Sequence, residues 1–367
     1  MSKKTIYIIL IIIAGLLVLG GVAWYLFFKP APAASIPGAD FTVPETASAV
    51  AEKISTISFG PVVAAYFNSG QGSILFYDYA GQLWQLKNGA PTPEVVSQNP
   101  IEDIADVIWS KNLTNIVQAG INNLDARYIF SDFTKKISVN LRGGIKVLAF
   151  SPDNSKIVYN VSETPETNAL LVSNPDGRSQ RILMNTLKLR DIDLSWPKTN
   201  IIGLASKPSG LVSGSAWILN VGSLVLTKVV GALPGLEVLW SPNGNVMAYS
   251  FVNQNASNPK LGIGKNGVLK EVGGISTLVG KCAWVSDSLY LYCAAPKSWP
   301  EGMILPDDFY KKIVLTSDDI WKISASTGEK ELIVSGLGDV SSVIAGNNVL
   351  YFISGSNRFL YRLNLTD

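Results

Sequence analysis

Histidine is absent from this chain of 367 residues, and cysteine occurs only twice. Without histidine the chain cannot assemble a Ser-His-Asp or Cys-His catalytic group, a histidine general base or a histidine-ligated metal site. Two cysteines, Cys282 and Cys293, are too few for a cysteine-rich zinc site. We therefore expect no bound metal and no histidine-based catalysis.

The chain also lacks an excess of charge of either sign. Its 30 lysines and arginines face 28 aspartates and glutamates, which gives a net charge of +2. Because binding to DNA or RNA normally needs a clustered excess of cations, we expect no nucleic-acid partner. A glycine pattern that begins at Gly262 matches a dinucleotide-binding motif, but it lies in a predicted strand and opens no helix. We therefore expect no cofactor.

A repeated unit is the most informative feature that is present. An apolar strand ends in an aromatic residue, a polar turn follows, and a second apolar strand comes next, as at Trp240-Ser241-Pro242-Asn243-Gly244. The anchor positions are Phe67, Trp109, Phe150, Trp196, Trp240, Trp284 and, with the aromatic residue lost, Ala345. Successive anchors are 41–46 residues apart, except for a last interval of 61. A period of about 40–45 residues with about four short strands is typical of a β-propeller blade.

Seven copies predict an all-β fold, a seven-bladed β-propeller that covers residues 51–367. The last unit has residues for only three strands. We expect its outer strand from the N-terminal side, where residues 53–58 alternate between apolar and polar types. Such a strand would close the ring and leave no long unpaired edge.

The N-terminal residues differ in character from the repeats. Residues 5–28 are 24 predominantly apolar residues without a charge, long enough for one transmembrane helix that acts as a signal anchor. Lys3 and Lys4 precede this stretch and only Lys29 follows closely, which predicts a cytoplasmic N-terminus and an extracytoplasmic propeller at the cell membrane. Residues 29–50 contain four prolines, which is typical of an extended spacer. A cleaved signal peptide is the alternative, although its apolar stretch is normally shorter.

A second motif follows the polar turns along the sequence. Strands with the pattern apolar-Trp-x-apolar follow them, for example Leu83-Trp84-Gln85-Leu86. Together the two motifs resemble the WD-type repeats of TolB-like propellers and, less closely, the propeller domains of prolyl oligopeptidases. The resemblance implies an extracytoplasmic propeller that binds other proteins through one of its faces. TolB-like proteins have six blades and an additional α/β domain, which these repeats do not match, and peptidase activity is not implied by the repeats alone.

Polar residues occupy equivalent positions three residues before several anchors, namely Asp106, Asp193, Glu237 and Lys281. In a propeller they would lie near the start of the innermost strands, around one mouth of the central channel. Carboxylates gathered there could bind a cation or a basic peptide, or act as a pair in glycoside hydrolysis. The alternative is a solvated channel with ion pairs between neighbours such as Glu237 and Lys281. We favour this alternative because structural ion pairs are commoner than sites.

The two cysteines flank a predicted hairpin. If its turn is Asp287-Ser288, Cys282 and Cys293 face each other across antiparallel strands, at a spacing that a disulfide can bridge. An oxidising extracytoplasmic compartment favours the bond. Two buried thiols between blades are the alternative.

The interval of 61 residues reflects an insertion at 295–316, between the second and third strands of the sixth unit. This insertion contains Trp299, Phe309 and Tyr310. Loops longer than about 12–15 residues in a compact domain are usually functional or disordered, and exposed aromatic residues suit a protein-binding patch. The alternative is a loop folded down over the sixth blade. In either case we expect the insertion on the same face as the acidic row.

These observations predict a binding protein rather than an enzyme. The favoured function is a membrane-anchored, extracytoplasmic propeller that serves as a protein-interaction or scaffold module, with another extracytoplasmic protein as its partner. A propeller that binds a glycan or a cell-wall ligand is the alternative. A carboxylate-based glycoside hydrolase requires two of Asp106, Asp193 and Glu237 to face each other across a cleft about 5–10 Å wide.

Overall fold

The computed structural model describes residues 54–365 except 98, 111–113, 121–126, 163–167 and 266. The expected transmembrane segment 5–28, the spacer 29–50 and the first residue of the expected closing strand lie outside the described residues. Within the part of the chain that is described, no helix has the length and apolar character needed to span a bilayer.

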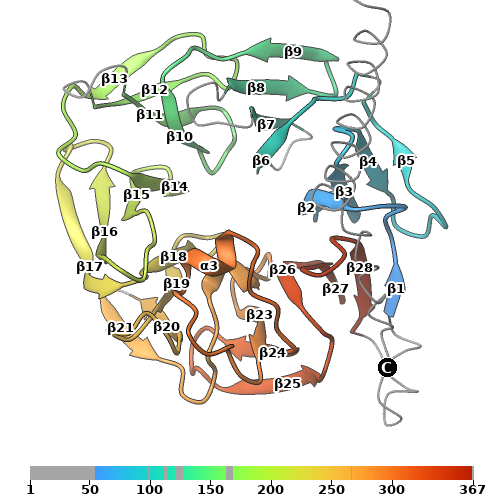
Figure 1. Cartoon of the computed structure of the whole chain (residues 1–367). Helices are drawn as coiled ribbons and strands as arrows, with labels where there is room; N and C mark the ends of the chain where they lie inside the picture. The colour runs from blue at the N-terminus through green and yellow to red at the C-terminus, as the bar shows by residue number, and fades with distance from the viewer. Residues whose placement is uncertain are drawn as a thin grey trace, which may run out of the picture. The chain divides into compact units, whose positions relative to one another are not determined.

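Seven four-stranded antiparallel sheets follow one another around a ring, which confirms the predicted seven-bladed propeller (Figure 1). Blade 1 contains β2 (Val62–Asn68), β3 (Ser73–Asp78), β4 (Leu83–Leu86) and β5 (Glu94–Val95). Blade 2 contains β6 (Ile104–Trp109), β7 (Thr114–Ala119), β8 (Arg127–Asp132) and β9 (Ile137–Asn140). Blade 3 contains β10 (Ile145–Phe150), β11 (Ile157–Val161), β12 (Ala169–Ser173) and β13 (Arg181–Met184). Blade 4 contains β14 (Ile192–Lys198), β15 (Ile201–Ser206), β16 (Ser213–Asn220) and β17 (Leu226–Pro234).

The remaining blades include the insertion and the ring closure. Blade 5 contains β18 (Glu237–Trp240), β19 (Val246–Phe251), β20 (Lys260–Lys265) and β21 (Val268–Glu271). Blade 6 contains β22 (Cys282–Trp284), β23 (Tyr290–Pro296), β24 (Asp318–Ser324) and β25 (Lys330–Val334). Blade 7 contains β26 (Val340–Ala345), β27 (Val349–Ser354), β28 (Leu360–Asn364) and β1 (Ile54–Thr56). Among the described residues, two short helices lie between strands, the 3₁₀ helix η2 (Val279–Lys281) and the α-helix α3 (Asp307–Tyr310).

The ring closes because β1 is the outer strand of the last blade. It runs antiparallel to β28, with Ile54 opposite Leu363. Beyond β1, the hydroxyl of Ser58 accepts a hydrogen bond of 3.0 Å from the backbone of Leu360. The guanidinium of Arg358 donates to the carbonyl of Val62 at the start of blade 1 over 3.3 Å. The two ends of the described chain are therefore held together by backbone pairing and by side chains.

The aromatic anchors wedge between neighbouring blades. The Trp109 ring of blade 2 stacks on Tyr66 of blade 1 with ring centroids 5.6 Å apart. The indole of Trp284 in blade 6 donates to the carbonyl of Leu239 in blade 5 over 3.0 Å. In each case the ring reaches back to the preceding blade. The aromatic anchors that identify the fold thus also contribute to packing between blades, and a ring contact of this kind adds about 0.5–1.5 kcal/mol beyond burial of its area.

The polar turn after each clear anchor is held by its own side chains. The Ser151 hydroxyl donates to Asp153 over 2.6 Å and accepts from the backbone of Lys156 over 2.9 Å. Hydroxyl groups of Ser151 and Ser155 lower the pKa of Asp153 to about 2. Ser-Pro-Asp therefore encodes a turn that satisfies its own polar groups, which explains why the motif recurs without any catalytic role.

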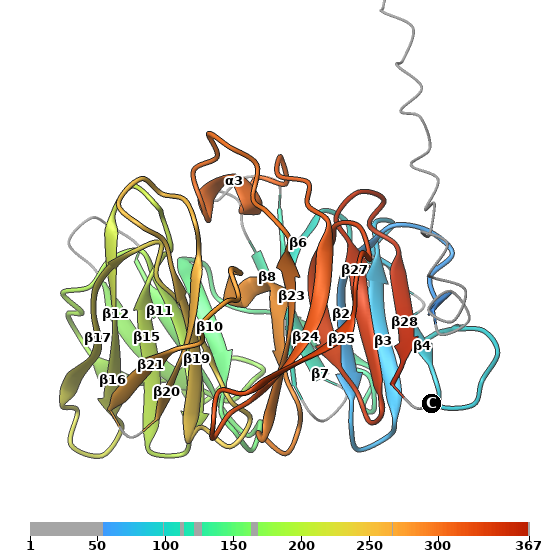
Figure 2. The ribbon, with the colours of Figure 1, turned by 90° about the horizontal axis from the view of Figure 1, so that it is seen from below.

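The propeller has two distinct faces. The α3 face carries the second-to-third-strand loops, the connections between blades, η2 and α3, and α3 stands above the strand ends there (Figure 2). The turn face carries the first-to-second and third-to-fourth strand turns. The insertion belongs to the α3 face because it joins β23 to β24.

Candidate functional site

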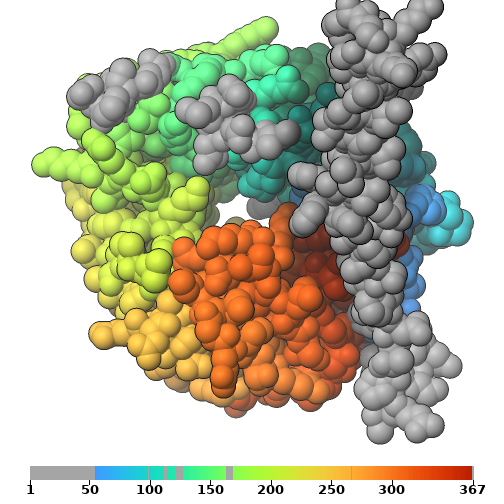
Figure 3. All heavy atoms as spheres, viewed as in Figure 1, coloured from blue at the N-terminus to red at the C-terminus, as the bar shows by residue number. Residues whose placement is uncertain are grey.

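A channel runs through the centre of the ring and opens on the α3 face (Figure 3). It forms a cavity of about 770 Å³. Carboxylates and ammonium groups from blades 2–4 line it, namely Asp106, Lys146, Asp193 and Lys207. Trp109 and Trp240 line it towards the turn face. The cavity volume is within the range of small-ligand sites.

Asp106 and Asp193 project from the innermost strands β6 and β14 into this channel. Both side chains reach channel water, yet protein surrounds them closely enough that loss of solvation raises the pKa of each carboxyl. The charge of Lys207 opposes this shift at Asp193, while the charge of Asp106 adds to it. Two of the four predicted residues therefore lie in the channel, where they sense each other electrostatically.

Glu237, the first residue of β18, is buried beside the channel mouth. Its carboxylate accepts hydrogen bonds from the Tyr310 hydroxyl and from the Ser250 hydroxyl, the latter over 2.8 Å. Burial raises the pKa of Glu237 to about 7, although the hydrogen bonds from Tyr310 and Ser250 oppose the shift. Burial of its hydroxyl and the charge of Glu237 raise the pKa of Tyr310 well above its usual range. Glu237 therefore fastens the insertion to blade 5.

Lys281 does not lie at the channel mouth, and its expected pairing with Glu237 is wrong. It ends the 3₁₀ helix η2 and is fully buried. Its ammonium donates to both carboxylate oxygens of Asp318, over 2.9 and 3.0 Å, and to the Thr316 hydroxyl over 2.9 Å. A buried ammonium needs such a partner, and Asp318 supplies it from the start of β24.

Two of the predicted aromatic residues cover this buried ion pair. The Lys281 ammonium lies 5.4 Å from the Trp299 ring centroid and 5.5 Å from that of Phe309. The Trp299 indole donates to the carbonyl of Ser276 over 3.2 Å. Trp299 and Phe309 therefore hold the insertion in place and are only partly exposed.

The insertion is folded down across blades 4–6. The carboxylate of Asp307 in α3 accepts from the Ser209 hydroxyl over 3.0 Å and from the backbone of Gly210 over 2.7 Å, both in the second-to-third-strand loop of blade 4. The backbone of Leu305 donates to Ala256 of blade 5 over 2.8 Å. A Cβ on Gly210 would lie 2.2 Å from the carbonyl oxygen of Leu305, so only glycine allows this close approach.

Five exposed apolar or aromatic residues remain around the folded insertion, and we refer to them as the α3 rim. They are Leu211 (71% exposed), Val212 (65%), Tyr310 (51%), Ile313 (61%) and Leu315 (61%). Sequence reasoning identified only Tyr310 among them. The signal that could have indicated Ile313 and Leu315 is the apolar run after two lysines in the insertion. Nothing in the sequence places the blade 4 loop beside that run.

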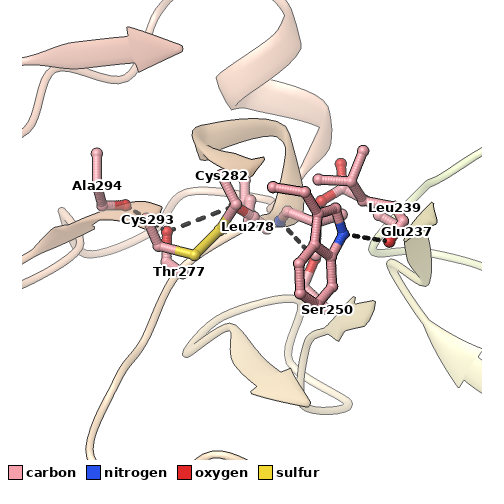
Figure 4. Close-up of a disulfide and its surroundings, with 10 residues drawn as sticks. Glu237, Leu239, Ser250, Thr277, Leu278, Cys282, Cys293 and Ala294 are labelled. Carbon is pink, nitrogen blue, oxygen red and sulfur yellow. Dashed lines mark hydrogen bonds between the residues drawn. A yellow bond between two sulfur atoms is a disulfide. The ribbon is translucent and has the colours of Figure 1, made fainter. Parts of the chain in front are cut away.

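The cysteines form a disulfide between β22 and β23 (Figure 4). Cys282 lies directly opposite Cys293 in the strand register, and their Cα atoms are 4.1 Å apart. Beside the bond, the Thr277 hydroxyl donates to the carbonyl of Ala294 over 2.6 Å. The bond therefore fastens the innermost strand of blade 6 to its neighbour, next to the η2 turn.

Reduction of this disulfide is expected to lower the free energy of unfolding by about 2–3 kcal/mol, because the bond restrains a loop of 11 residues in the unfolded chain. Chemical denaturation of the full chain with and without a reductant measures this. The Cys282→Ala/Cys293→Ala variant, as control, should not respond to the reductant. Two titratable thiols in the unfolded, non-reduced protein would contradict the assignment.

The described residues offer limited chemistry at the channel. Among them, no three histidine, cysteine, aspartate or glutamate side chains gather in a way that could hold a metal ion. Glu237 is occupied by Tyr310 and Ser250, and Asp106 accepts a hydrogen bond of 2.8 Å from the backbone of Val107. Glu237 is therefore already engaged, and Asp106 and Asp193 are the two carboxyls of the described chain that line the channel.

Three solved structures share the propeller architecture at low sequence identity. An oligogalacturonate lyase in complex with manganese aligns over 86% of this chain and 91% of its own, with a TM-score of 0.57 and 10% identity. The tricorn protease aligns over 85% of this chain and 34% of its own, with a TM-score of 0.53 and 8% identity. TolB from Acinetobacter baumannii aligns over 83% of this chain and 63% of its own, with a TM-score of 0.46 and 13% identity. No protein-family model and no curated protein matches the sequence.

The likenesses to the oligogalacturonate lyase and to the tricorn protease, both with TM-scores above 0.5, establish the fold alone. TolB and the oligogalacturonate lyase are structural neighbours of a seven-bladed propeller that has little sequence in common with either. This chain spans under two thirds of the TolB structure and about a third of the tricorn protease. Function therefore has to be argued from the site.

Proposed function

We propose that this protein is a membrane-anchored, extracytoplasmic propeller that binds another protein through its α3 face. The apolar stretch 5–28 and the lysines before it support the anchor and its orientation. The propeller fold is compatible with an interaction module, and the insertion at 295–316 elaborates one face only.

The observation that carries the proposal is the α3 rim. Its residues come from blades 4 and 6, and Asp307 holds the two segments together. Buried residues of the insertion pack against blade 5, where Leu305 and Val314 form one cluster with Val252 and Ala256. Since the segment is fixed by buried contacts, the exposure of Ile313 and Leu315 belongs to an ordered surface. Ordered, exposed apolar residues beside a polar channel mouth are typical of protein-interaction sites.

The glycan alternative has less support. Recognition of sugars by stacking needs aromatic faces that are free for a ligand. Trp109 is already stacked on Tyr66, and the Trp284 indole is bonded to blade 5. Tyr310 is the most exposed aromatic residue at the channel mouth, and its hydroxyl is held by Glu237.

Site-specific photo-crosslinking in intact cells tests the proposal. A photoreactive amino acid at Ile313 of the full chain is expected to yield one dominant crosslinked protein. Ile182 on the outer strand β13 is the matched control, because it is a 54% exposed isoleucine away from the insertion. We expect at least a tenfold lower yield of the same product from Ile182. Equal yields from both positions, or none from Ile313, would contradict the proposal.

A further inference from the structure

The chain joins the propeller on the turn face. Ile54, the first residue of β1, lies opposite Leu363 near the end of β28, and Leu365 just beyond is bonded to Asn348 in the first turn of blade 7 over 3.1 Å. From there β1 runs towards the α3 face and connects to β2. The apolar stretch 5–28 lies before Ile54 in the sequence, so the chain that follows this stretch enters the propeller at the turn face.

Aliphatic residues stand exposed on the turns of three consecutive blades on this same face. Leu224 (42% exposed) and Val225 (57%) lie in the last turn of blade 4, Val268 (70%) lies at the start of β21, and Leu289 (60%) lies in the first turn of blade 6. We refer to these four residues as the turn-face tips. Leu224 and Val225 share one turn, while Val268 and Leu289 belong to the two following blades, so the tips form three shallow projections rather than a groove.

The first turns of these three blades are packed against one another. The backbone of Asn243 in blade 5 donates to the Ser288 hydroxyl of blade 6 over 3.1 Å. A Cβ on Gly244, in the same turn, would lie 2.6 Å from the carbonyl oxygen of Pro197 in blade 4. The turn that carries Leu289 is therefore part of one packed layer of turns.

Cations outnumber anions around the turn-face tips. The cations are Lys198, Lys265, Lys270, Lys322 and Lys330, and the anions are Asp287, Glu329 and Glu331. Glu331 is paired with Lys322 over 3.6 Å. Exposed aliphatic side chains surrounded by lysines are the combination that binds to the interface of an anionic bilayer.

We propose that the turn face of blades 4–6 rests on an anionic lipid surface, with its tips in the headgroup region and the α3 rim turned away from the bilayer. This inference rests on the membrane tether of the proposed function. A lipid surface is favoured over a second protein because the tips are separate shallow projections, because lysines surround them, and because the chain that carries the apolar stretch joins this face. The same orientation leaves the α3 rim open to a partner.

Fluorescence quenching on the full chain in vesicles tests this orientation. An environment-sensitive maleimide probe is attached to Leu289→Cys or Val268→Cys, and the oxidised Cys282–Cys293 pair does not react. The vesicles contain phosphatidylcholine, a nitroxide lipid as quencher, and phosphatidylglycerol as about a third of the lipid, which makes the surface anionic. We expect at least twofold stronger quenching at these positions than at Ile313→Cys on the α3 face.

A variant with reversed charges tests whether anionic lipid attracts the turn face or whether the turn face is only close to the bilayer. Lys265→Glu/Lys270→Glu is expected to reduce quenching at Leu289→Cys to the level found in pure phosphatidylcholine. Near-ultraviolet circular dichroism confirms that each variant is folded. Quenching at Ile313→Cys that equals or exceeds quenching at Leu289→Cys would overturn the proposal, and so would quenching at neither position.

The outcomes are distinguishable from failure of the proposed function. Extraction of the full chain from membranes by alkali would overturn the tether, while the quenching pattern can still be measured with the chain added to preformed vesicles. Absence of a crosslinked partner at Ile313 would overturn the protein-binding role without changing the quenching at Leu289→Cys.

Discussion

Replacing Lys281 with methionine is expected to lower the free energy of unfolding by about 3–5 kcal/mol. The Lys281–Asp318 pair is fully buried, and methionine keeps the length of the side chain but removes its charge. Burial raises the pKa of Asp318 against the opposing effect of Lys281, so this carboxylate already lies in an unfavourable environment. Without the ammonium, Asp318 keeps its hydrogen bonds from Thr316 and from the backbone of Val340 but loses its only charge partner among the described residues.

Two control variants make this result specific. Lys260→Met removes a lysine from the Lys260–Glu271 pair, in which both side chains are 54% exposed, and should change the free energy of unfolding by less than about 1 kcal/mol. The Lys281→Met/Asp318→Leu variant removes both charges and should recover part of the loss, because no buried charge is then left unpaired. Urea denaturation of the full chain measures all three. A loss at Lys281→Met no larger than at Lys260→Met would show that the pair is not buried as described.

Changing Glu237 to glutamine is expected to alter how stability depends on pH. The pKa of Glu237 in the folded protein is about 7, above the ordinary value of 4.5, because the carboxyl is buried. The folded state therefore favours the protonated form. The stability that the folded protein gains from the protonated Glu237 carboxyl is fully present below about pH 4.5. It is lost as the pH rises through about 7, which lowers the free energy of unfolding by about 3 kcal/mol. Glutamine stays neutral, so the variant should gain about 3 kcal/mol relative to the natural chain between pH 4.5 and pH 8.

Urea denaturation at pH 4.5, 6 and 8 measures this relative gain. Asp106 and Asp193 also have raised pKa values and are present in both chains, so the difference between the two chains reports Glu237 together with its electrostatic coupling to Asp193. Glu301→Gln changes an exposed residue of the same insertion and serves as the matched control. Parallel stability curves for the natural chain and Glu237→Gln would contradict the description of Glu237 as a buried carboxyl that fastens the insertion.

The fold could be predicted because its signal is local and repeated. Six of the seven units carry an aromatic anchor and Ala345 takes its place in the last, while the clearest copies add a polar turn that satisfies itself, so the period is visible in seven places. Ring closure shows in the alternation of residues 53–58 and in the missing outer strand of the last unit. Cys282 and Cys293 lie opposite each other because of the register of a single hairpin, which spans only 12 residues.

The site was less predictable because it depends on contacts between distant segments. Lys281 finds Asp318 across the insertion, 37 residues along the chain. The equivalence of Lys281 with Asp106 and Asp193 failed because η2 replaces the start of the innermost strand in blade 6. Leu211 and Val212 join the α3 rim only because Asp307 binds the neighbouring loop, 97 residues away. Periodicity shows which residues share a position in their blades, but it does not show where an inserted segment comes to lie.

Co-purification shows whether the α3 rim binds a protein partner. The full chain and its Ile313→Asp/Leu315→Asp variant are isolated from membranes together with the protein that crosslinks at Ile313. We expect at least a tenfold loss of that protein from the variant and no loss from Ile182→Asp, with unchanged melting temperatures for both. Equal recovery of the partner with the natural chain and with the rim variant would contradict binding at the α3 rim.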